Sequence, residues 1–254
     1  MNWASRRRFV ITAIGAALII FVLALILVPT LYQAPSCTDR TQNQGEQGVD
    51  CGGPCSLLCT ALQQAPVVRF TKALFPAPNR VDVIAYVDNP NTGAAARRAP
   101  YTLTLYAADR TILKQATGTL DLPPFRSVPV YVPAFFTGNV AGAQAFLTID
   151  PSKVTWFTFK GTLTLPKVAS PAVGGTEGAP RVTATLSNPT FVPMTDIIAV
   201  GVVYDASDNV IAASQTLLKT IPPQGSVTAT FTWGQPFGLP PARIEVMPLP
   251  VLPS

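Results

Sequence analysis

The pattern of hydrophobic and polar residues divides the chain into one uninterrupted apolar run and a long region of short alternating segments. The run extends from Phe9 to Val28 and contains no charged side chain. At about 1.5 Å per residue, a helix of this length covers the roughly 30 Å hydrocarbon core of a bilayer. The run therefore predicts one transmembrane α-helix, the signal anchor, within residues 9–31.

The charges on either side of this run predict its orientation. Arg6, Arg7 and Arg8 stand directly before it, and none of the ten residues after it is charged. By the positive-inside rule, residues 1–8 are expected in the cytoplasm and the C-terminal region outside it. A cleaved signal peptide is the alternative, with small residues at Ala34 and Ser36 where a peptidase reads. The run is longer than the 7–15 residues usual for that class, so we expect an uncleaved single-pass anchor in the cell membrane.

Beyond residue 62, apolar and polar residues alternate over short runs separated by turn signals, which is typical of half-buried strands. Landmarks of this region return 99 residues later: Asn89-Pro90 as Asn188-Pro189, and Leu122-Pro123-Pro124 as Ile221-Pro222-Pro223. The repetition predicts a tandem duplication, with one copy in residues 63–151 and the other in residues 152–254.

Each copy is expected to be an immunoglobulin-like sandwich, because it offers six or seven short strands with turn signals every 8–12 residues. A leading strand is expected at Val67–Lys72 in the first copy and at Val154–Leu165 in the second. In that second strand, alternation places at least one of Trp156, Phe157 and Phe159 in a core. The predicted fold class is all-β: two tandem immunoglobulin-like β-sandwiches, preceded by one transmembrane helix and a short cysteine-rich segment at residues 32–62.

Composition supports this picture and narrows the partners. The 26 prolines are spread along the chain, which disfavours long amphipathic helices. The net charge of +5 includes the three arginines before the apolar run, so the remainder of the chain is nearly neutral. A nucleic-acid-binding surface is therefore not expected.

The four cysteines fall within a single short segment, at Cys37, Cys51, Cys55 and Cys59. In an exported segment that is too short and polar to form its own core, they predict two disulfides, with three connectivities open. A structural zinc site is the alternative. It is disfavoured because the chain has no Cys-x2-Cys pair and no histidine.

Oxygen-bearing side chains lie between the first two cysteines on a loop that contains Gly45 and Gly48. Such side chains are the ligands that calcium prefers, although the spacing does not match an EF-hand. The alternative is a polar loop whose side chains cap its own turns. The candidate calcium ligands are Asp39, Asn43, Glu46 and Asp50, and no other cofactor is expected.

The cysteine segment resembles a recurrent element of bacterial surface proteins. Residues 37–55 read Cys-x-Asp-x3-Asn-x-Gly-Glu-x-Gly-Val-Asp-Cys-Gly-Gly-Pro-Cys. In a group of uncharacterised single-pass surface proteins this element follows a signal anchor and precedes a domain similar to residues 81–95. The later region also resembles the late-embryogenesis-abundant-like and Phe-x-Leu-Tyr-Asp sandwich domains, with partial matches at residues 103–107 and 201–205. These resemblances imply location and architecture, and no activity.

No catalytic motif is apparent. The absence of histidine excludes Ser-His-Asp triads, and no glycine-rich phosphate loop occurs. We expect the protein not to be an enzyme, although carboxylates that converge in space would be the alternative. The expected function is a membrane-anchored extracytoplasmic binding or scaffold protein, with protein partners at the cell envelope. A structural subunit of an envelope assembly, such as a pilus or secretion apparatus, is the second alternative.

Overall fold

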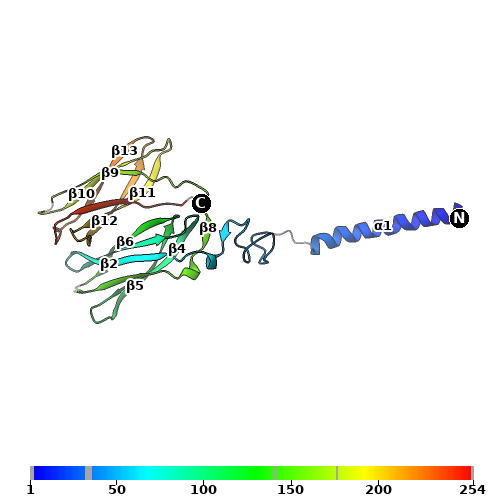
Figure 1. Cartoon of the computed structure of the whole chain (residues 1–254), viewed down its shortest axis with the longest axis horizontal. Coiled ribbons are helices and arrows are strands. Elements are labelled where there is room, and N and C mark those ends of the chain that lie inside the picture. The colour runs from blue at the N-terminus through cyan, green and yellow to red at the C-terminus, as the bar shows by residue number, and fades with distance from the viewer. Residues whose placement is uncertain (1–2, 32–35, 139, 141, 176, 253–254) are drawn as a thin grey trace. The chain divides into compact units, whose positions relative to one another are not determined.

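The computed structural model describes residues 3–31, 36–138, 140, 142–175 and 177–252. The helix α1 spans Trp3–Leu31, and strands make up most of the regular structure beyond it (Figure 1). Within α1, the segment Ser5–Leu27 is long and apolar enough to cross a membrane. A membrane anchor and a signal sequence both have this property. The possible cleavage site at residues 34–36 lies almost entirely outside the described residues.

The chain divides into two compact units, and the boundary in sequence falls between Cys55 and Ser56. The first contains α1 and most of the cysteine-rich segment, and the second contains all the named strands. The predicted cysteine-rich segment of residues 32–62 is therefore divided. Its last part belongs to the second unit, because Leu57 and Leu58 pair with a strand of that unit.

Two antiparallel sheets form the first sandwich. In one sheet β4 has β5 along one edge and both β7 and β8 along the other, and β1 pairs with β8. The second sheet has the order β2-β3-β6. The bounds are β1 Leu57–Leu58, β2 Val67–Ala77, β3 Arg80–Asn89, β4 Ala94–Tyr106, β5 Ile112–Leu122, β6 Arg126–Thr137, β7 Gln144–Thr148 and β8 Trp156–Thr158.

The second sandwich has the same strand order. Its sheets are β12-β11-β14 and β13-β10-β9, which correspond to β5-β4-β7 and β6-β3-β2 of the first. Both are β-sandwiches of the immunoglobulin-like class, as expected from the alternation pattern. The bounds are β9 Lys167–Gly174, β10 Arg181–Ser187, β11 Met194–Tyr204, β12 Val210–Ile221, β13 Ser226–Thr232 and β14 Arg243–Pro248.

The boundary between the sandwiches differs from the expected one. The leading strand expected at Val154–Leu165 does not open the second sandwich, because β8 pairs with Ala94–Ala96 of β4. Trp156 is 1% exposed within the core of the first sandwich. The first sandwich therefore extends to Thr158 and the second begins at Lys167. The part of β4 that β7 does not cover is free to pair with this strand, and neither the residue pattern nor the spacing in sequence indicates that pairing.

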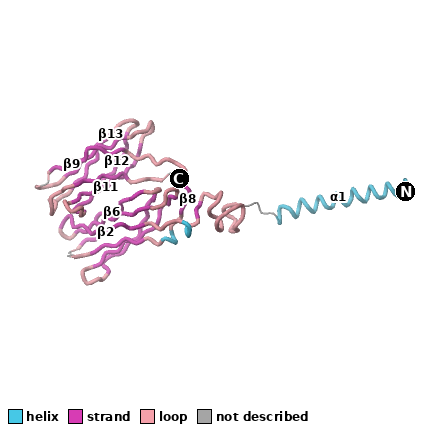
Figure 2. Tube along the Cα trace, viewed as in Figure 1, coloured by secondary structure: helices cyan, strands magenta, loops and turns pink. Residues whose placement is uncertain are grey.

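The four sheets lie in four layers (Figure 1), and the strands of all four appear in magenta in Figure 2. A shared hydrophobic cluster joins the sheet β2-β3-β6 to the sheet β12-β11-β14. On β3, Val83 and Ala85 face the core of the first sandwich, whereas Ile84 and Tyr86 face the second. Because β3 is buried on both faces, its sequence is almost continuously apolar.

The two faces that end the stack carry polar residues on their central strands. Thr102 and Thr104 of β4 point away from the core of their sandwich, whereas the corresponding β11 residues Val200 and Val202 lie in the shared cluster. The outer face of β10 and β13 is likewise rich in hydroxyl groups, and Thr183 pairs there with Thr230. The outer face of the first sandwich is mixed, because Phe146 lies beside Thr104 and is 51% exposed.

Two buried asparagines organise equivalent turns in the two sandwiches. Asn89 is 1% exposed, and its Nδ2 donates to the carbonyl oxygens of Ala94, Leu122 and Pro123 at 2.8, 3.3 and 2.9 Å. Asn188 is 2% exposed, and its Nδ2 donates to the carbonyl oxygens of two residues, Val192 at 2.8 Å and Ile221 at 3.2 Å. The Asn-Pro pairs thus have a structural role in both sandwiches.

The end of the chain returns to the first sandwich. The Leu249 amide donates to the Ile198 carbonyl at 2.7 Å, and the Leu252 amide donates to Asp121 Oδ2 of β5 at 3.0 Å. Leu249 packs against both the core of the first sandwich and the shared cluster. The last described residues therefore connect the two sandwiches a second time.

Candidate functional site

All four predicted disulfide cysteines are oxidised. Cys37 and Cys55 are bonded to each other with an S–S distance of 2.02 Å, and Cys51 and Cys59 are also disulfide-bonded. A zinc site built from four thiolates is therefore excluded, because no described cysteine is free to bind a metal. Arg6, Arg7 and Arg8 lie exposed in the first turns of α1, directly before the apolar run.

We predict that a cysteine-reactive polyethylene glycol leaves the folded protein unmodified and adds four labels after reduction and unfolding, one for each cysteine. Only the thiolate reacts with such reagents, and a disulfide offers none. Gel mobility before and after treatment with a reductant measures the number of labels. Labelling of the unreduced protein would contradict the two disulfides.

The four candidate calcium ligands hold the turns of their own loop. Both carboxylate oxygens of Asp50 accept from the Arg40 amide at 3.1 Å, and Glu46 Oε2 accepts from the Asp50 amide at 3.2 Å. Asp39 Oδ2 accepts from Asn43 Nδ2 at 2.8 Å, a hydrogen bond that holds the pKa of Asp39 below its usual value.

One atom of this group keeps the calcium prediction open. The buried Oδ1 atom of Asn43 has no hydrogen-bond partner. The calcium site stays a prediction, which titration calorimetry of the full chain with Ca²⁺ tests.

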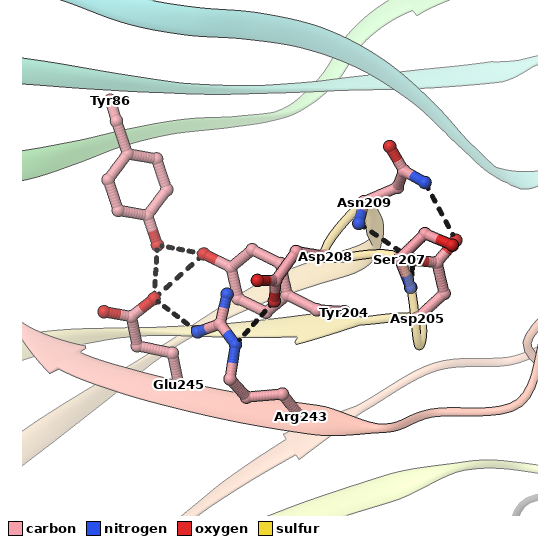
Figure 3. A network of polar contacts seen from close by, with 8 residues as sticks. All are labelled: Tyr86, Tyr204, Asp205, Ser207, Asp208, Asn209, Arg243 and Glu245. Atoms are coloured by element: carbon pink, nitrogen blue, oxygen red, sulfur yellow. Dashed lines mark hydrogen bonds and ion pairs between the residues drawn. The ribbon is translucent and has the colours of Figure 1, made fainter.

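A polar network crosses the boundary between the sandwiches (Figure 3). The Tyr86 hydroxyl of β3 lies 3.0 Å from the Tyr204 hydroxyl of β11, and both donate to Glu245 Oε2 of β14, at 3.3 and 2.9 Å. Arg243 stacks on the Tyr204 ring at 3.6 Å and donates to Asp208 Oδ1 at 2.9 Å. The tyrosine hydroxyls and Glu245 thus join the two sandwiches at the margin of their shared apolar cluster, where Arg243 and Asp208 are partly exposed.

The turn beside this network is held by its own carboxylate. Asp205 Oδ1 accepts from the amides of Ser207 and Asn209 at 2.9 and 2.8 Å, as Figure 3 shows. These hydrogen bonds, with that of Asn209 the largest cause, lower the pKa of Asp205 below its usual value. The turn places Asp208 within reach of Arg243.

We predict that the second unit loses stability above pH 10 through Tyr86. Burial, and then the hydrogen bond with Tyr204 and the charge of Glu245, raise the pKa of Tyr86 far above its ordinary value of 10.0. The neutral phenol therefore stabilises the folded state fully below pH 10, and this contribution decreases as the pH rises further. One such group lowers the free energy of unfolding by up to about 1.4 kcal/mol for each pH unit above 10.

The measurement is urea unfolding of the wild type and of Tyr86→Phe between pH 8 and pH 12. At pH 8 the free energy of unfolding of the phenylalanine variant is expected to be about 1 kcal/mol lower than that of the wild type, because the variant lacks the hydroxyl and its hydrogen bonds. It should then depend less on pH than the wild type. Equal alkaline slopes in the two proteins would contradict the assignment.

A cavity of about 360 Å³ opens between the two sandwiches. The turn that joins β2 to β3 forms one wall, and β12 together with residues 233–238 forms the other. The wall residues from the first sandwich include Phe75, which is 53% exposed, and Asn79. From the second sandwich they include Trp233, Gln235 and Phe237.

The aromatic wall is rigid. Trp233 is 7% exposed and donates from Nε1 to the Ala213 carbonyl at 3.1 Å. Its ring packs against Phe237 with a centroid distance of 5.1 Å and an interplanar angle of 73°. This edge-to-face arrangement is the one that aromatic pairs favour. Since Trp233 is held by a hydrogen bond and a ring contact, the cavity is largely preformed.

The cavity contains one buried carboxylate, which is fully engaged. Asp82 is 1% exposed and accepts from Arg80 Nε at 2.7 Å and Nη2 at 3.0 Å. It also accepts from the Ala134 amide at 2.7 Å and from the Tyr131 hydroxyl. Burial, and then the hydrogen bond with Asp82, raise the pKa of Tyr131 well above its usual value. Asp82 thus holds Arg80 in place at the edge of the cavity.

Sequence reasoning did not find this cavity or the Tyr86 network. Asp82 within the apolar run of β3 was the available signal, because an acidic residue in a strand buried on both faces requires partners. Its partners are Arg80 on the same strand and Tyr131 and Ala134 on β6, and the last two lie at separations in sequence that no local pattern reveals.

No family model matches this chain, and none of the curated proteins matches it. Among solved structures, the chain is similar to a β-glucuronidase from glycoside hydrolase family 2, at 9% identity and a TM-score of 0.22. The alignment covers 81% of this chain and 26% of that one, so the chain spans about a quarter of the enzyme's length. At this TM-score the similarity carries no argument about function.

Proposed function

We propose that this chain is a membrane-anchored extracytoplasmic binding or scaffold protein. The apolar segment of α1 serves as the anchor, with Arg6, Arg7 and Arg8 on the cytoplasmic side. The oxidised cysteines support an oxidising compartment for everything that follows. The two sandwiches, which we infer to be a tandem duplication, then form the part that meets the partner at the cell envelope.

The observation that carries a binding role is the preformed cavity between two sandwiches that share a core. Ligand sites occur preferentially at domain interfaces, in hollows of about 300–1,000 Å³ with a few placed polar groups. The shared cluster and the Tyr86 network hold the two walls at a constant separation. A rigid site needs less ordering when it binds, which improves affinity.

A catalytic role is not supported by this cavity. Asp82 accepts four hydrogen bonds and has no capacity left to act as a base. The chain has no histidine to replace it. We therefore propose a protein that binds without transforming its ligand.

The alternative of a polymerising envelope subunit is less well supported. Repeated stacking of copies would require apolar faces at both ends of the four layers. Thr183 and Thr230 occupy one of those faces, and the other carries Thr102 and Thr104 beside Phe146, so at least one end of the stack has the polar surface of a repeat that ends an array. We therefore favour the binding role over the structural subunit.

Single cysteines test the proposed topology, since the native cysteines are oxidised. The substitution Ser226→Cys lies in the second sandwich, and the substitution Ser5→Cys precedes the uncharged run that begins at Phe9. A membrane-impermeant maleimide should label Ser226→Cys on intact cells and Ser5→Cys only after permeabilisation. The reverse pattern would overturn the proposal, and release of the protein from membranes at high pH would favour the cleaved signal peptide.

A photo-crosslinking residue at position 75 tests the binding role. Position 191, where Phe191 is 87% exposed outside the cavity, serves as the matched control. We expect a specific adduct on intact cells from position 75 that position 191 does not give. Identical adducts from the two positions would contradict a role for the cavity.

A further inference from the structure

The geometry points to an uncharged saccharide as the ligand of the cavity between the sandwiches, an inference that rests on the proposed binding function. Three properties of the walls carry it. They have no unpaired charge, they present aromatic rings, and each sandwich contributes one amide side chain.

The charge of the cavity is balanced internally. Among its lining residues only Arg80 and Asp82 are charged, and they form an ion pair with an N–O distance of 2.7 Å. An ionic ligand would have to leave water without an opposite charge to compensate it, which costs free energy. Anionic ligands such as phosphates, and cationic peptides, are therefore disfavoured.

The aromatic and proline surfaces fit the apolar faces of a sugar ring. Phe75 stands on one wall with half of its surface exposed, and Phe237 stands on the opposite wall against Trp233. Pro76, Pro78 and Pro236 also line the cavity and add rigid apolar surface. A pyranose ring presents C–H groups on its faces, so it can be covered by such surfaces while its edge remains polar.

The polar groups match hydroxyl chemistry. Asn79 and Gln235 are exposed wall residues, and each amide offers both donors and an acceptor. A sugar hydroxyl also donates and accepts, so it can use both functions of one amide. Arg80 contacts Asp82 through Nε and Nη2, which leaves Nη1 to donate to a ligand oxygen.

The turn in the first-sandwich wall offers side chains and not a strand edge to a ligand. Peptides that bind to sheets pair with the exposed edge of a strand. In the wall from the first sandwich, Ala77 and Arg80 pair with each other across a tight turn in which Asn79 has φ 60°. The backbone of this turn is already paired, so its side chains provide the recognition, whereas β2 and β12 each end their sheet and a neutral peptide is therefore included in the test. The volume of about 360 Å³ lies at the small end of ligand sites, in the range of a mono- or disaccharide.

The test uses the full chain in lipid nanodiscs, which avoids detergents that carry sugar headgroups. Maltose, cellobiose and diacetylchitobiose are the neutral probes, and glucuronate and glucosamine are the charged ones. Calorimetry and saturation-transfer NMR measure the dissociation constant. We expect at least one neutral probe to bind below about 10 mM and the charged ones to bind at least about tenfold more weakly.

Variants connect the binding to the cavity. Asn79→Ala, Gln235→Ala and Phe75→Ala should each raise the dissociation constant about tenfold, the effect of losing about 1.4 kcal/mol. Gln215→Ala on β12, outside the cavity, is the matched control and should bind as the wild type does. Circular dichroism confirms that every variant is folded.

The saccharide inference is overturned if folded wild type binds no neutral probe, if charged probes bind equally well, or if the three variants bind like the control. A neutral peptide whose binding is lost in the same variants would also overturn it, and would leave the proposed binding function in place. Failure of the topology labelling would overturn the proposed function itself.

Discussion

Replacement of Trp156 by alanine is expected to lower the free energy of unfolding of the second unit by about 3–5 kcal/mol, the usual cost of truncating a large buried aromatic residue. Trp156 is among the largest fully buried side chains of the described chain and fills the core of the first sandwich from β8. The variant loses both the transfer free energy of the ring and its packing contacts. Urea unfolding followed by circular dichroism measures the change.

Phe157→Ala is the matched control for this prediction. Phe157 lies next to Trp156 on the same strand, is partly exposed and stacks under Arg97 at 4.4 Å. Its removal is expected to cost about 1 kcal/mol, the order of a cation–π contact at the surface. If the two variants lost equal stability, Trp156 would not hold β8 in the first sandwich, and the boundary at residue 151 would become tenable again.

Replacement of Asn89 by alanine is expected to cost about 3 kcal/mol, because it removes the two N–H donors that its Nδ2 shares among three backbone carbonyls at a buried turn. Each unsatisfied buried group costs about 1–3 kcal/mol, less what water recovers by entering the site. Asn188→Ala should cost somewhat less, since its Nδ2 satisfies two carbonyls. Thermal and urea unfolding of the two variants provide the comparison.

Asn209→Ala serves as the control for the asparagine variants. Asn209 is exposed, and its side chain donates only to Asp205 Oδ2, at 3.2 Å. Its loss should change stability by less than about 0.5 kcal/mol, as expected at the surface. A comparable loss in all three variants would mean that the buried asparagines do not organise their turns.

Much of the fold could be predicted from the sequence, because it depends on local patterns. The apolar run from Phe9 gave the helix, and alternation gave most of the strands. The return of Asn89-Pro90 at Asn188-Pro189 indicated that both turns have one structural role, and the hydrogen bonds of the two side chains are equivalent.

The wrong assignment of β8 to the second sandwich shows what local patterns cannot predict. Alternation indicated that at least one of Trp156, Phe157 and Phe159 belongs in a core, which Trp156 does, but it could not tell which core. The choice depends on a vacant stretch of β4, where Ala96 pairs with Trp156 across 60 residues of sequence. The same limit applies to the candidate site, since Phe75 and Asn79 line one cavity with Gln235 only when the two sandwiches pack together.

The return of the C-terminal residues to the first sandwich has a consequence for the order of events during synthesis. The first sandwich is made early, but its face around Ile84 and Tyr86 remains uncovered until β11 and β14 exist. Leu249, which follows β14, packs against the same face. During synthesis the early half therefore passes through a stage in which this apolar face is exposed to water, and the arrival of β11, β14 and Leu249 ends that stage.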